Sequence, residues 1–171
     1  MKLEYIKKIL KNEFDNFIVK VNNICDKPEL LGSLLEENNK YEKEINPRLL
    51  NFHKLLKKED LFDLFLKSKL KLFSSKSEDT NNLSTSLFGV DLTLKFVLNN
   101  RSSEIKSSIW KYLHLFYFLI ESSVENNSKD RVNKISLLLS DNKSDSKSDS
   151  KSDSKSNVTD NVDVDISEKV K

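Results

Sequence analysis

The sequence predicts an all-α fold, a compact bundle of about six to seven helices around one central apolar helix at about 103–124. Apolar residues recur at steps of three and four over long stretches, which is the helical period. Helix-start signals, in which a polar cap and a proline stand together, punctuate the chain. The 171 residues hold two Gly and two Pro, too few for collagen-like, linker-like or glycine-rich phosphate-loop architectures.

The clearest helical period lies in residues 3–24, where apolar side chains form one stripe. The stripe consists of Leu3, Ile6, Leu10, Phe14, Phe17, Val21 and Ile24, with Lys7, Lys8, Lys11, Glu13 and Asp15 around it. Two interpretations are open. The stripe packs on the core of its own domain, or its heptad-like spacing pairs with the helix of a partner.

Two start signals follow this helix. Asp26-x-x-Glu29 resembles a capping box with Pro28 in the first turn. The short helix that it starts would bury Leu30, Leu31, Leu34 and Leu35. Asn46-Pro47 repeats the signal and predicts a helix through Leu56.

Glu59-Asp60 predicts the start of another helix, which continues toward Phe73. Lys69-Leu70-Lys71-Leu72 alternates with a period of two, so a strand is the alternative over residues 66–73. Residues 74–86 are rich in Ser and Asn and predict a loop.

Gly89 supplies the turn into the next segment, which we expect to be a helix over 91–98 capped by Asp91, with a strand as the alternative. Ser102 or Ser103 then caps the central helix, which is apolar nearly all round and therefore buried on several sides. Its expected core residues are Ile105, Ile109, Trp110, Leu113, Phe116, Tyr117 and Ile120. A final short helix, with Val132, Ile135, Leu138 and Leu139, closes a domain of residues 1–139.

The composition changes at residue 140. Lys-Ser-Asp-Ser occurs three times over 143–154, and this repeat has no apolar residue. Without apolar surface to bury, nothing offsets the ordering cost of about 1–2 kcal/mol per residue. We therefore expect 140–171 to be a disordered, low-complexity tail. Ser146 and Ser150, each followed three residues later by Asp, are candidate phosphorylation sites, although a purely solvating tail is the simpler interpretation.

The charge balance argues against a strongly basic protein, with 29 basic and 27 acidic groups and a net charge of +2. The best candidate surface for nucleic acid is Lys54, Lys57, Lys58, Lys67, Lys69 and Lys71, interleaved with Phe62, Phe65 and Phe73. Glu59, Asp60 and Asp63 interrupt this surface, and the three phenylalanines fall on the expected core stripe.

No catalytic, cofactor-binding or metal-binding motif is found. We expect His114 to be a core or boundary histidine, His53 to lie at the surface, and Cys25 to be a structural thiol whose thiolate Asp26 disfavours. We accordingly predict no enzyme activity, no cofactor and no metal site.

Residues 109–117, Ile-Trp-Lys-Tyr-Leu-His-Leu-Phe-Tyr, and residues 86–92, Ser-Leu-Phe-Gly-Val-Asp-Leu, resemble a pattern in uncharacterised helical proteins of giant DNA viruses. The resemblance covers about 35 residues. It implies a helical viral protein of unknown role, and it brings no catalytic residues with it.

These observations lead to a function hypothesis. We expect a non-enzymatic helical protein-interaction or virion/host-adaptor module, with a protein partner or self-association; the alternative is a nucleic-acid-binding accessory protein that uses the lysine surface. The N-terminus does not predict a secretory signal, and the most apolar window, 109–120, is shorter than the ~20 residues of a membrane span. We therefore expect an intracellular, soluble protein, in host cytoplasm or virion if viral, with no membrane partner.

Overall fold

The computed structural model describes residues 3–149, with side chains described over residues 3–140. Within this range the chain forms eight α-helices and one short 3-10 helix, and it contains no strand. This confirms the predicted fold class. The elements are α1 (Leu3–Cys25), α2 (Pro28–Asn38), α3 (Pro47–Leu55), α4 (Glu59–Leu66), η1 (Leu70–Phe73), α5 (Glu78–Thr85), α6 (Leu94–Leu98), α7 (Ser103–Ser123) and α8 (Lys129–Asp149).

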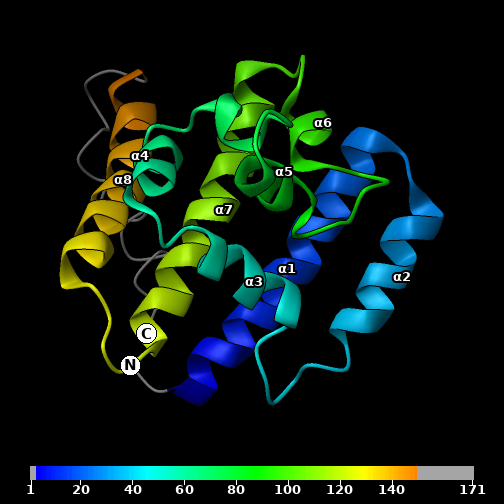
Figure 1. Ribbon diagram of the computed structural model, residues 1–171, viewed down its shortest axis with the longest axis horizontal. Helices are drawn as coiled ribbons and strands as arrows, with labels where there is room; N and C mark the ends of the chain where they lie inside the picture. Colours follow the sequence, from blue (N-terminus) through cyan, green and yellow to red (C-terminus); the bar gives the residue numbers. More distant parts are fainter. Residues whose placement is uncertain (1–2, 150–171) are drawn as a thin grey trace.

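Helix α7 lies at the centre of the bundle and packs against α1, α3, α6 and α8 (Figure 1). Ser102 caps its start by accepting a hydrogen bond from the Ile105 amide. Of the residues expected to form the core on this helix, Ile105 is half-buried, and the others are buried. A helix that is apolar on most sides needs neighbours on most sides, and α7 has them.

The apolar stripe of α1 packs on α7 within the domain, with the Phe14 and Phe17 rings in edge contact with Phe116. The stripe is therefore part of the domain's own core, and its central residues are not available to a partner helix. Glu13 was expected beside the stripe but is 7% exposed. Position 13 follows Leu10 by three residues and precedes Phe17 by four, so it lies on the stripe itself.

The junction between α1 and α2 differs in one detail from the prediction. Helix α2 begins at Pro28 as expected, but Asp26 does not cap it. Asp26 has φ 53°, and its amide donates to the Asn22 carbonyl at 2.9 Å, which terminates α1. A residue in this left-handed conformation cannot also take the extended conformation of an N-cap.

A buried polar chain fixes α2 and α3 to α1. The Asn38 amide donates to the Asp15 carboxylate at 2.9 Å and to the Lys11 carbonyl at 3.0 Å. Asn46 donates in turn to the Asn38 side-chain oxygen at 2.9 Å. Asn46 also caps α3, as predicted, by accepting from the Arg48 amide. Because every link is a satisfied hydrogen bond, the polar chain is compatible with burial.

Helix α4 begins at Glu59 as predicted but ends at Leu66. Ser68, with φ 53°, turns the chain, and residues 70–73 form the 3-10 helix η1 rather than a continued helix or a strand. The left-handed turn breaks the helical period, and burial of Leu72 and Phe73 holds the short turn in place.

The prediction of a loop over residues 74–86 is wrong, because residues 78–85 form helix α5. Ser77 and Thr80 form a reciprocal capping box at its start, with the Thr80 amide 3.2 Å from the Ser77 hydroxyl. Leu83 anchors the helix in the core. The Ser- and Asn-rich composition suggested a loop, but capping and one buried leucine outweigh weak helix propensity.

The strand alternative over 91–98 is also excluded, because residues 94–98 form helix α6. Gly89 adopts φ 95° and supplies the expected turn. The cap is Thr93, which accepts from the Phe96 amide at 3.2 Å, rather than Asp91. Asp91 still belongs to the turn that Gly89 opens, so the cap lies two residues later than predicted.

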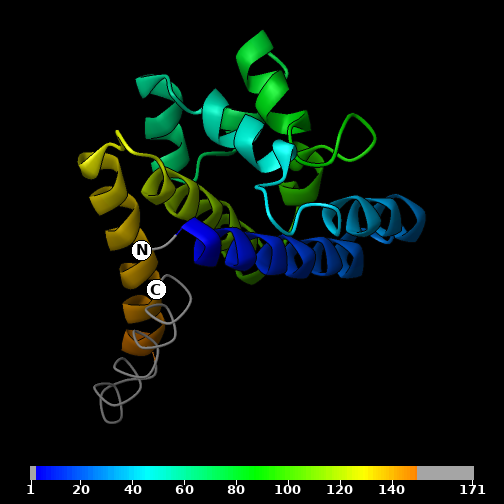
Figure 2. The ribbon, with the colours of Figure 1, turned by 90° about the horizontal axis from the view of Figure 1, so that it is seen from below.

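Helix α8 packs on α7 and α4 through its first turns, where Ile135 and Leu139 are buried. Its backbone then continues to Asp149, so the helix does not end near residue 139 as expected (Figure 2). The first residues assigned to the tail thus continue the backbone of α8, and side chains are described only as far as residue 140. The rest of the predicted tail, 150–171, lies outside the described residues.

Candidate functional site

The two candidate phosphorylation sites fall where side chains are not described. Ser146 belongs to the backbone of α8, and its side chain lies outside the described ones; Ser150 lies outside the described residues altogether. Phosphorylation of either serine stays a prediction from the sequence.

The lysine surface is present, but its aromatic component is not. All six of its lysines are exposed. However, Phe62, Phe65 and Phe73 are at most 2% exposed, so their rings cannot stack on bases. Lys58 and Lys67 are moreover paired with Asp79 and Asp63. The structure therefore brings together lysines and carboxylates rather than lysines and exposed rings.

His114 is a core histidine, as expected. Its Nε2 lies 2.9 Å from the Phe65 carbonyl oxygen, and since a carbonyl only accepts, Nε2 carries the proton and donates. Nδ1 is buried and has no hydrogen-bond partner among the described residues. Burial lowers the pKa of His114 to about 4, an effect that the Phe65 carbonyl only partly opposes.

His53 does not lie at the surface, which corrects the prediction. It shares the inward face of α3 with Leu49, Phe52 and Leu56, at steps of three and four residues. Its Nε2 donates to the Glu121 carboxylate of α7 at 2.7 Å. Burial lowers the pKa of His53, and hydrogen bonding and charge from Glu121 oppose this only in part.

Glu121 stays ionised in this setting. Burial raises the pKa of its carboxyl, but the Ser128 amide, which donates at 2.8 Å, and His53 outweigh burial, so the pKa lies below its usual value. A neutral imidazole that donates to a carboxylate is a charge-assisted hydrogen bond. The pair joins α3, α7 and the segment before α8.

Arg131 extends this cluster and attaches α8 to the body. Its Nη1 donates to the Leu56 carbonyl at 2.9 Å and to the Tyr117 hydroxyl at 3.0 Å. Its Nη2 donates to Glu59 at 2.9 Å, and the guanidinium lies 4.1 Å from the Phe62 ring centroid. Burial is the main reason that the pKa of Tyr117 rises to about 12, so its hydroxyl keeps its proton. Every group in the cluster of His53, Tyr117, Glu121 and Arg131 has a partner within the protein. Because the cluster holds α8 against the other helices, we call it the clasp.

Sequence analysis did not single out Glu121 or Arg131. One signal was available, because Arg48, Arg101 and Arg131 are the only arginines of the chain. In the structure each one joins segments that are distant in sequence: Arg48 bonds Glu37 and the Leu87 carbonyl, and Arg101 bonds Cys25. A rare residue type with five donors is suited to such tertiary contacts.

Cys25 is half-buried at the end of α1, and the Arg101 Nη2 lies 3.4 Å from its sulfur. Burial raises the pKa of the thiol, with Arg101 and Lys27 opposing. The protonated, unreactive thiol that we expected is therefore favoured, but the cause is burial rather than the charge of Asp26.

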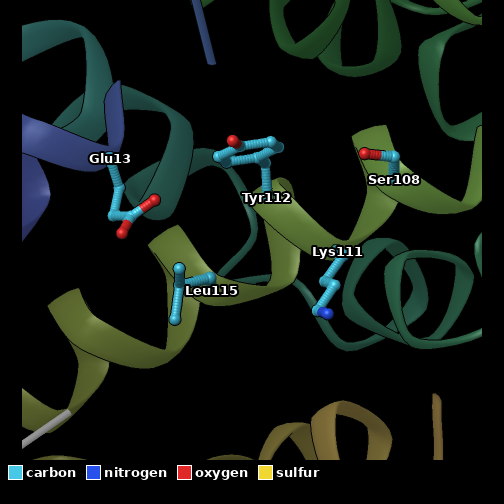
Figure 3. A pocket seen from close by; sticks show the side chains of 5 residues that line it. All are labelled: Glu13, Ser108, Lys111, Tyr112 and Leu115. Atoms are coloured by element: carbon cyan, nitrogen blue, oxygen red, sulfur yellow. The ribbon is translucent and has the colours of Figure 1, made fainter. Parts of the chain in front are cut away.

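A pocket of about 180 Å³ opens between α1 and α7. Figure 3 shows its five side chains: Glu13 comes from α1, and Ser108, Lys111, Tyr112 and Leu115 come from one face of α7. The Tyr112 hydroxyl end points toward Glu13, and Glu13 and Lys111 lie on opposite sides of the group (Figure 3). We call this the α1–α7 pocket. It combines a carboxylate, an ammonium group, two hydroxyls and an apolar wall.

A second pocket, of about 390 Å³, lies at the corner between α1 and α2. It is lined by residues 26–30 and by Asp91, from the loop that runs beside this corner in Figure 1. Two of the most exposed large apolar side chains are close to this corner. Val90, next to Asp91 in the chain, is 80% exposed, and Phe96, which contacts the arginine bonded to Cys25, is 51% exposed. We call residues 26–30, Val90, Asp91 and Phe96 the corner surface.

Contacts hold the corner surface together as one region. Arg101 bonds Cys25 at the end of α1, and its guanidinium lies 5.5 Å from the Phe96 ring centroid. Three of the four residues with positive φ in the described chain, Asp26, Gly89 and Asn100, occur in the turns around it. These turns fix the shape of the region.

Within the described residues no group of three or more His, Cys, Asp or Glu side chains is placed to hold a metal ion. None of the helices described there is long and apolar enough to cross a membrane.

The fold and these sites define the class: an all-helical domain with a buried aromatic core, a polar clasp for its last helix and two surface pockets. Comparison of the chain with protein-family models, with characterised proteins and with solved structures finds no match.

Proposed function

We propose that the protein is a non-enzymatic helical interaction module that docks a protein partner on the corner surface. The observation that carries this proposal is the exposure of Val90, next to the pocket residue Asp91, and of Phe96, linked through Arg101 to the end of α1, around a pocket with apolar and acidic walls. Large apolar side chains exposed together and rimmed by polar groups are typical of interaction sites.

The charges of the corner surface indicate the chemistry of the partner. Asp26, Glu29 and Asp91 line the pocket together with one ammonium group, that of Lys27. The local charge is therefore negative in a chain whose net charge is +2. Complementarity then favours a segment in which Lys or Arg stands beside a large apolar side chain. The apolar side chain packs against Val90, Phe96 and Pro28.

The histidines support the non-enzymatic part of the proposal. His114 donates to a backbone carbonyl inside the core, and His53 donates to Glu121 in the clasp of α8. These hydrogen bonds account for the positions of both side chains, and burial accounts for their lowered pKa values. An acid–base catalyst needs a titrating group that reaches a substrate, and the core position of His114 does not offer one.

The test is selection of partners from a displayed random peptide library on the full-length protein, followed by binding measurements with the enriched peptides. We expect enrichment of peptides with a basic residue next to an apolar one, and weaker binding at high salt. Val90→Ser should reduce affinity about tenfold. Val124→Ser is the matched control, since Val124 is also exposed but lies at the end of α7.

The second part of the test neutralises the three carboxylates of the corner surface. Asp26→Asn, Glu29→Gln and Asp91→Asn keep shape while removing charge, and Asn tolerates the left-handed conformation of position 26. If the triple variant and Val90→Ser both bind the enriched peptides as tightly as the natural chain does, the corner surface is refuted as the docking site. Salt-dependent binding of a labelled single-stranded oligonucleotide that Lys54→Glu and Lys57→Glu abolish would favour the nucleic-acid alternative instead.

The viral part of the hypothesis, a virion or host-adaptor role, is part of the same proposal and rests on the resemblance of residues 86–92 and 109–117. The first segment contains the Gly89 turn, and the second contributes Trp110 and Phe116 to the core. The matching residues are thus fold-forming ones. Detection of the chain in purified virions, rather than only in infected-cell cytoplasm, is the measurement that decides between the two locations.

A further inference from the structure

The short loop between η1 and α5, residues 74–77, contains three serines that the structure treats differently. Ser74 donates to the Thr80 hydroxyl at 3.3 Å. Ser77 caps α5 by accepting from the Thr80 amide at 3.2 Å. Ser75 is exposed, and its hydroxyl has no hydrogen-bond partner among the described residues. It is therefore the one hydroxyl of this loop that an enzyme could reach without breaking a contact of the fold.

The residues that follow Ser75 are those that acid-directed kinases select. Glu78 stands three positions after the serine and is exposed, and Asp79 stands four positions after it with a side chain that is 42% exposed. Carboxylates at these positions can pair with basic side chains in the substrate groove of a kinase. The same spacing of serine and carboxylate makes Ser146 and Ser150 candidate sites.

The tertiary structure separates Ser75 from two other serines with the same spacing. Ser33 and Ser122 also precede a glutamate by three residues. Ser33 lies inside α2 and donates to the Glu29 carbonyl at 3.2 Å, and Ser122 lies in the last turn of α7.

A kinase takes the residues around its acceptor in an extended conformation, so a serine within a helix must first be freed by local unfolding. Ser75 needs no such step. The residues on either side of it in the loop are already extended, with φ −70° and ψ 162° at Ser74 and φ −131° and ψ 162° at Ser77.

We propose that Ser75 is a phosphorylation site for an acid-directed Ser/Thr kinase. In the transfer, the Ser75 Oγ attacks the γ-phosphorus of ATP held by the kinase, and a new O–P bond forms. The bond between the γ-phosphorus and the β–γ bridging oxygen breaks, so ADP leaves. The hydroxyl proton passes to the catalytic base of the kinase. This chain supplies the acceptor oxygen and the carboxylates that the kinase recognises.

The phosphate would change the charge of the lysine surface, which borders the loop. Lys71 belongs to η1, and Lys58 pairs with Asp79 at the start of α5. Asp79 and Asp63 pair with two of the six lysines, and the other four have no ion-pair partner among the described residues. Phosphoserine carries about −1.5 to −2 charges at pH 7, so it would offset roughly half of the unpaired positive charge.

The experiment is phosphorylation of the folded, full-length chain by a purified acid-directed kinase, casein kinase 2, with ATP. Digestion and mass spectrometry then measure the rate at each serine. We expect phosphate on Ser75 at a rate at least about tenfold above that on Ser33 or Ser122, because both of these require unfolding of a helix. Synthetic peptides of residues 27–39 and 69–81, which have no fold to unwind, should be phosphorylated at similar rates.

Variants of the full chain test the recognition. Glu78→Gln removes the carboxylate three positions after Ser75 and should slow phosphorylation there about tenfold. Glu44→Gln is the matched control, since Glu44 is an exposed loop glutamate that no serine precedes by three residues. Ser75→Ala should remove this phosphopeptide and no other.

Three results would overturn the proposal. The first is an unmodified Ser75 in the folded chain under conditions in which the 69–81 peptide is phosphorylated. The second is equal rates at Ser75 in the Glu78→Gln variant and in the natural chain. The third is phosphorylation of Ser33 in the folded chain as fast as that of Ser75. None of these results depends on the corner surface.

Discussion

Mild acid should destabilise this protein, and His114 should be the main cause. Its imidazole is 1% exposed, donates through Nε2 to the Phe65 carbonyl, and leaves Nδ1 without a partner among the described residues. Protonation would place a positive charge in the core and would create a second buried N–H, at Nδ1, with no acceptor among the described residues. The folded protein therefore resists protonation, and the unfolded chain does not.

The size of the effect follows from the pKa difference between the two states. The pKa of His114 is about 4 in the folded protein and 6.5 in a solvated histidine. Between these values the unfolded chain binds more protons, so stability is full above pH 6.5 and is lost as the pH falls toward 4. The loss between pH 7 and pH 5 is about 2 kcal/mol from this histidine alone.

Two neighbouring effects have the same sign. The pKa of His53 is also lowered by burial, so it adds to the loss in the same pH range. Glu121, with a lowered carboxyl pKa, contributes stability that is lost only as the pH falls through a value below 4.5. Measurements between pH 7 and pH 5 therefore isolate the histidines from this carboxylate.

The assay is urea unfolding at pH 7, 6 and 5, followed by the fluorescence of Trp110, the single tryptophan. His114→Gln keeps a donor toward the Phe65 carbonyl but does not titrate in this range. It will be less stable at pH 7 because it loses the ring contact with Phe65, but its stability should change far less between pH 7 and pH 5. An equal loss in His114→Gln and in the natural chain would refute the reasoning.

Three further predictions concern Arg131, Asn38 and the two glycines. Arg131→Met removes the donors to Leu56, Tyr117 and Glu59 and should cost roughly 2–3 kcal/mol, seen as faster amide exchange in α8 than in α7. Asn38→Ala leaves buried polar groups unpaired and should cost about 2–3 kcal/mol in urea unfolding, whereas exposed Asn12→Ala should change little. Gly89→Ala, at φ 95°, should destabilise by roughly 1 kcal/mol, but Gly32→Ala in α2, where nothing lies near the added carbon, should stabilise by about 1 kcal/mol.

Each of these has an outcome that contradicts it. Uniform loss of exchange protection across α7 and α8 in Arg131→Met would mean that the clasp stabilises the whole domain rather than α8. Equal unfolding midpoints for Asn38→Ala and Asn12→Ala would remove the polar chain from the core. A thermal shift of the same sign in both glycine variants would show that backbone conformation does not decide their effect.

The sequence alone determined the fold class and most helix positions, because periodicity and caps act locally. The stripe of α1, the Asn46-Pro47 start of α3 and the Ser102 cap of α7 all depend on residues within one or two turns of each other. Prediction from local sequence failed where two local signals, composition and helix capping, indicated different structures. Residues 78–85 looked like a loop by composition and formed α5 through the Ser77 and Thr80 capping box.

The candidate sites were decided by the tertiary structure, because their residues come from distant segments. His53 and Glu121 are 68 positions apart, and the hydrogen bond between them could not be read from either neighbourhood. Glu13 meets the face of α7 only because α1 and α7 pack together. The corner surface joins residues 26–30 to Asp91 in the same way. Helical period specifies which face of a helix is apolar, but packing alone decides which faces meet, and therefore where pockets and polar clusters form.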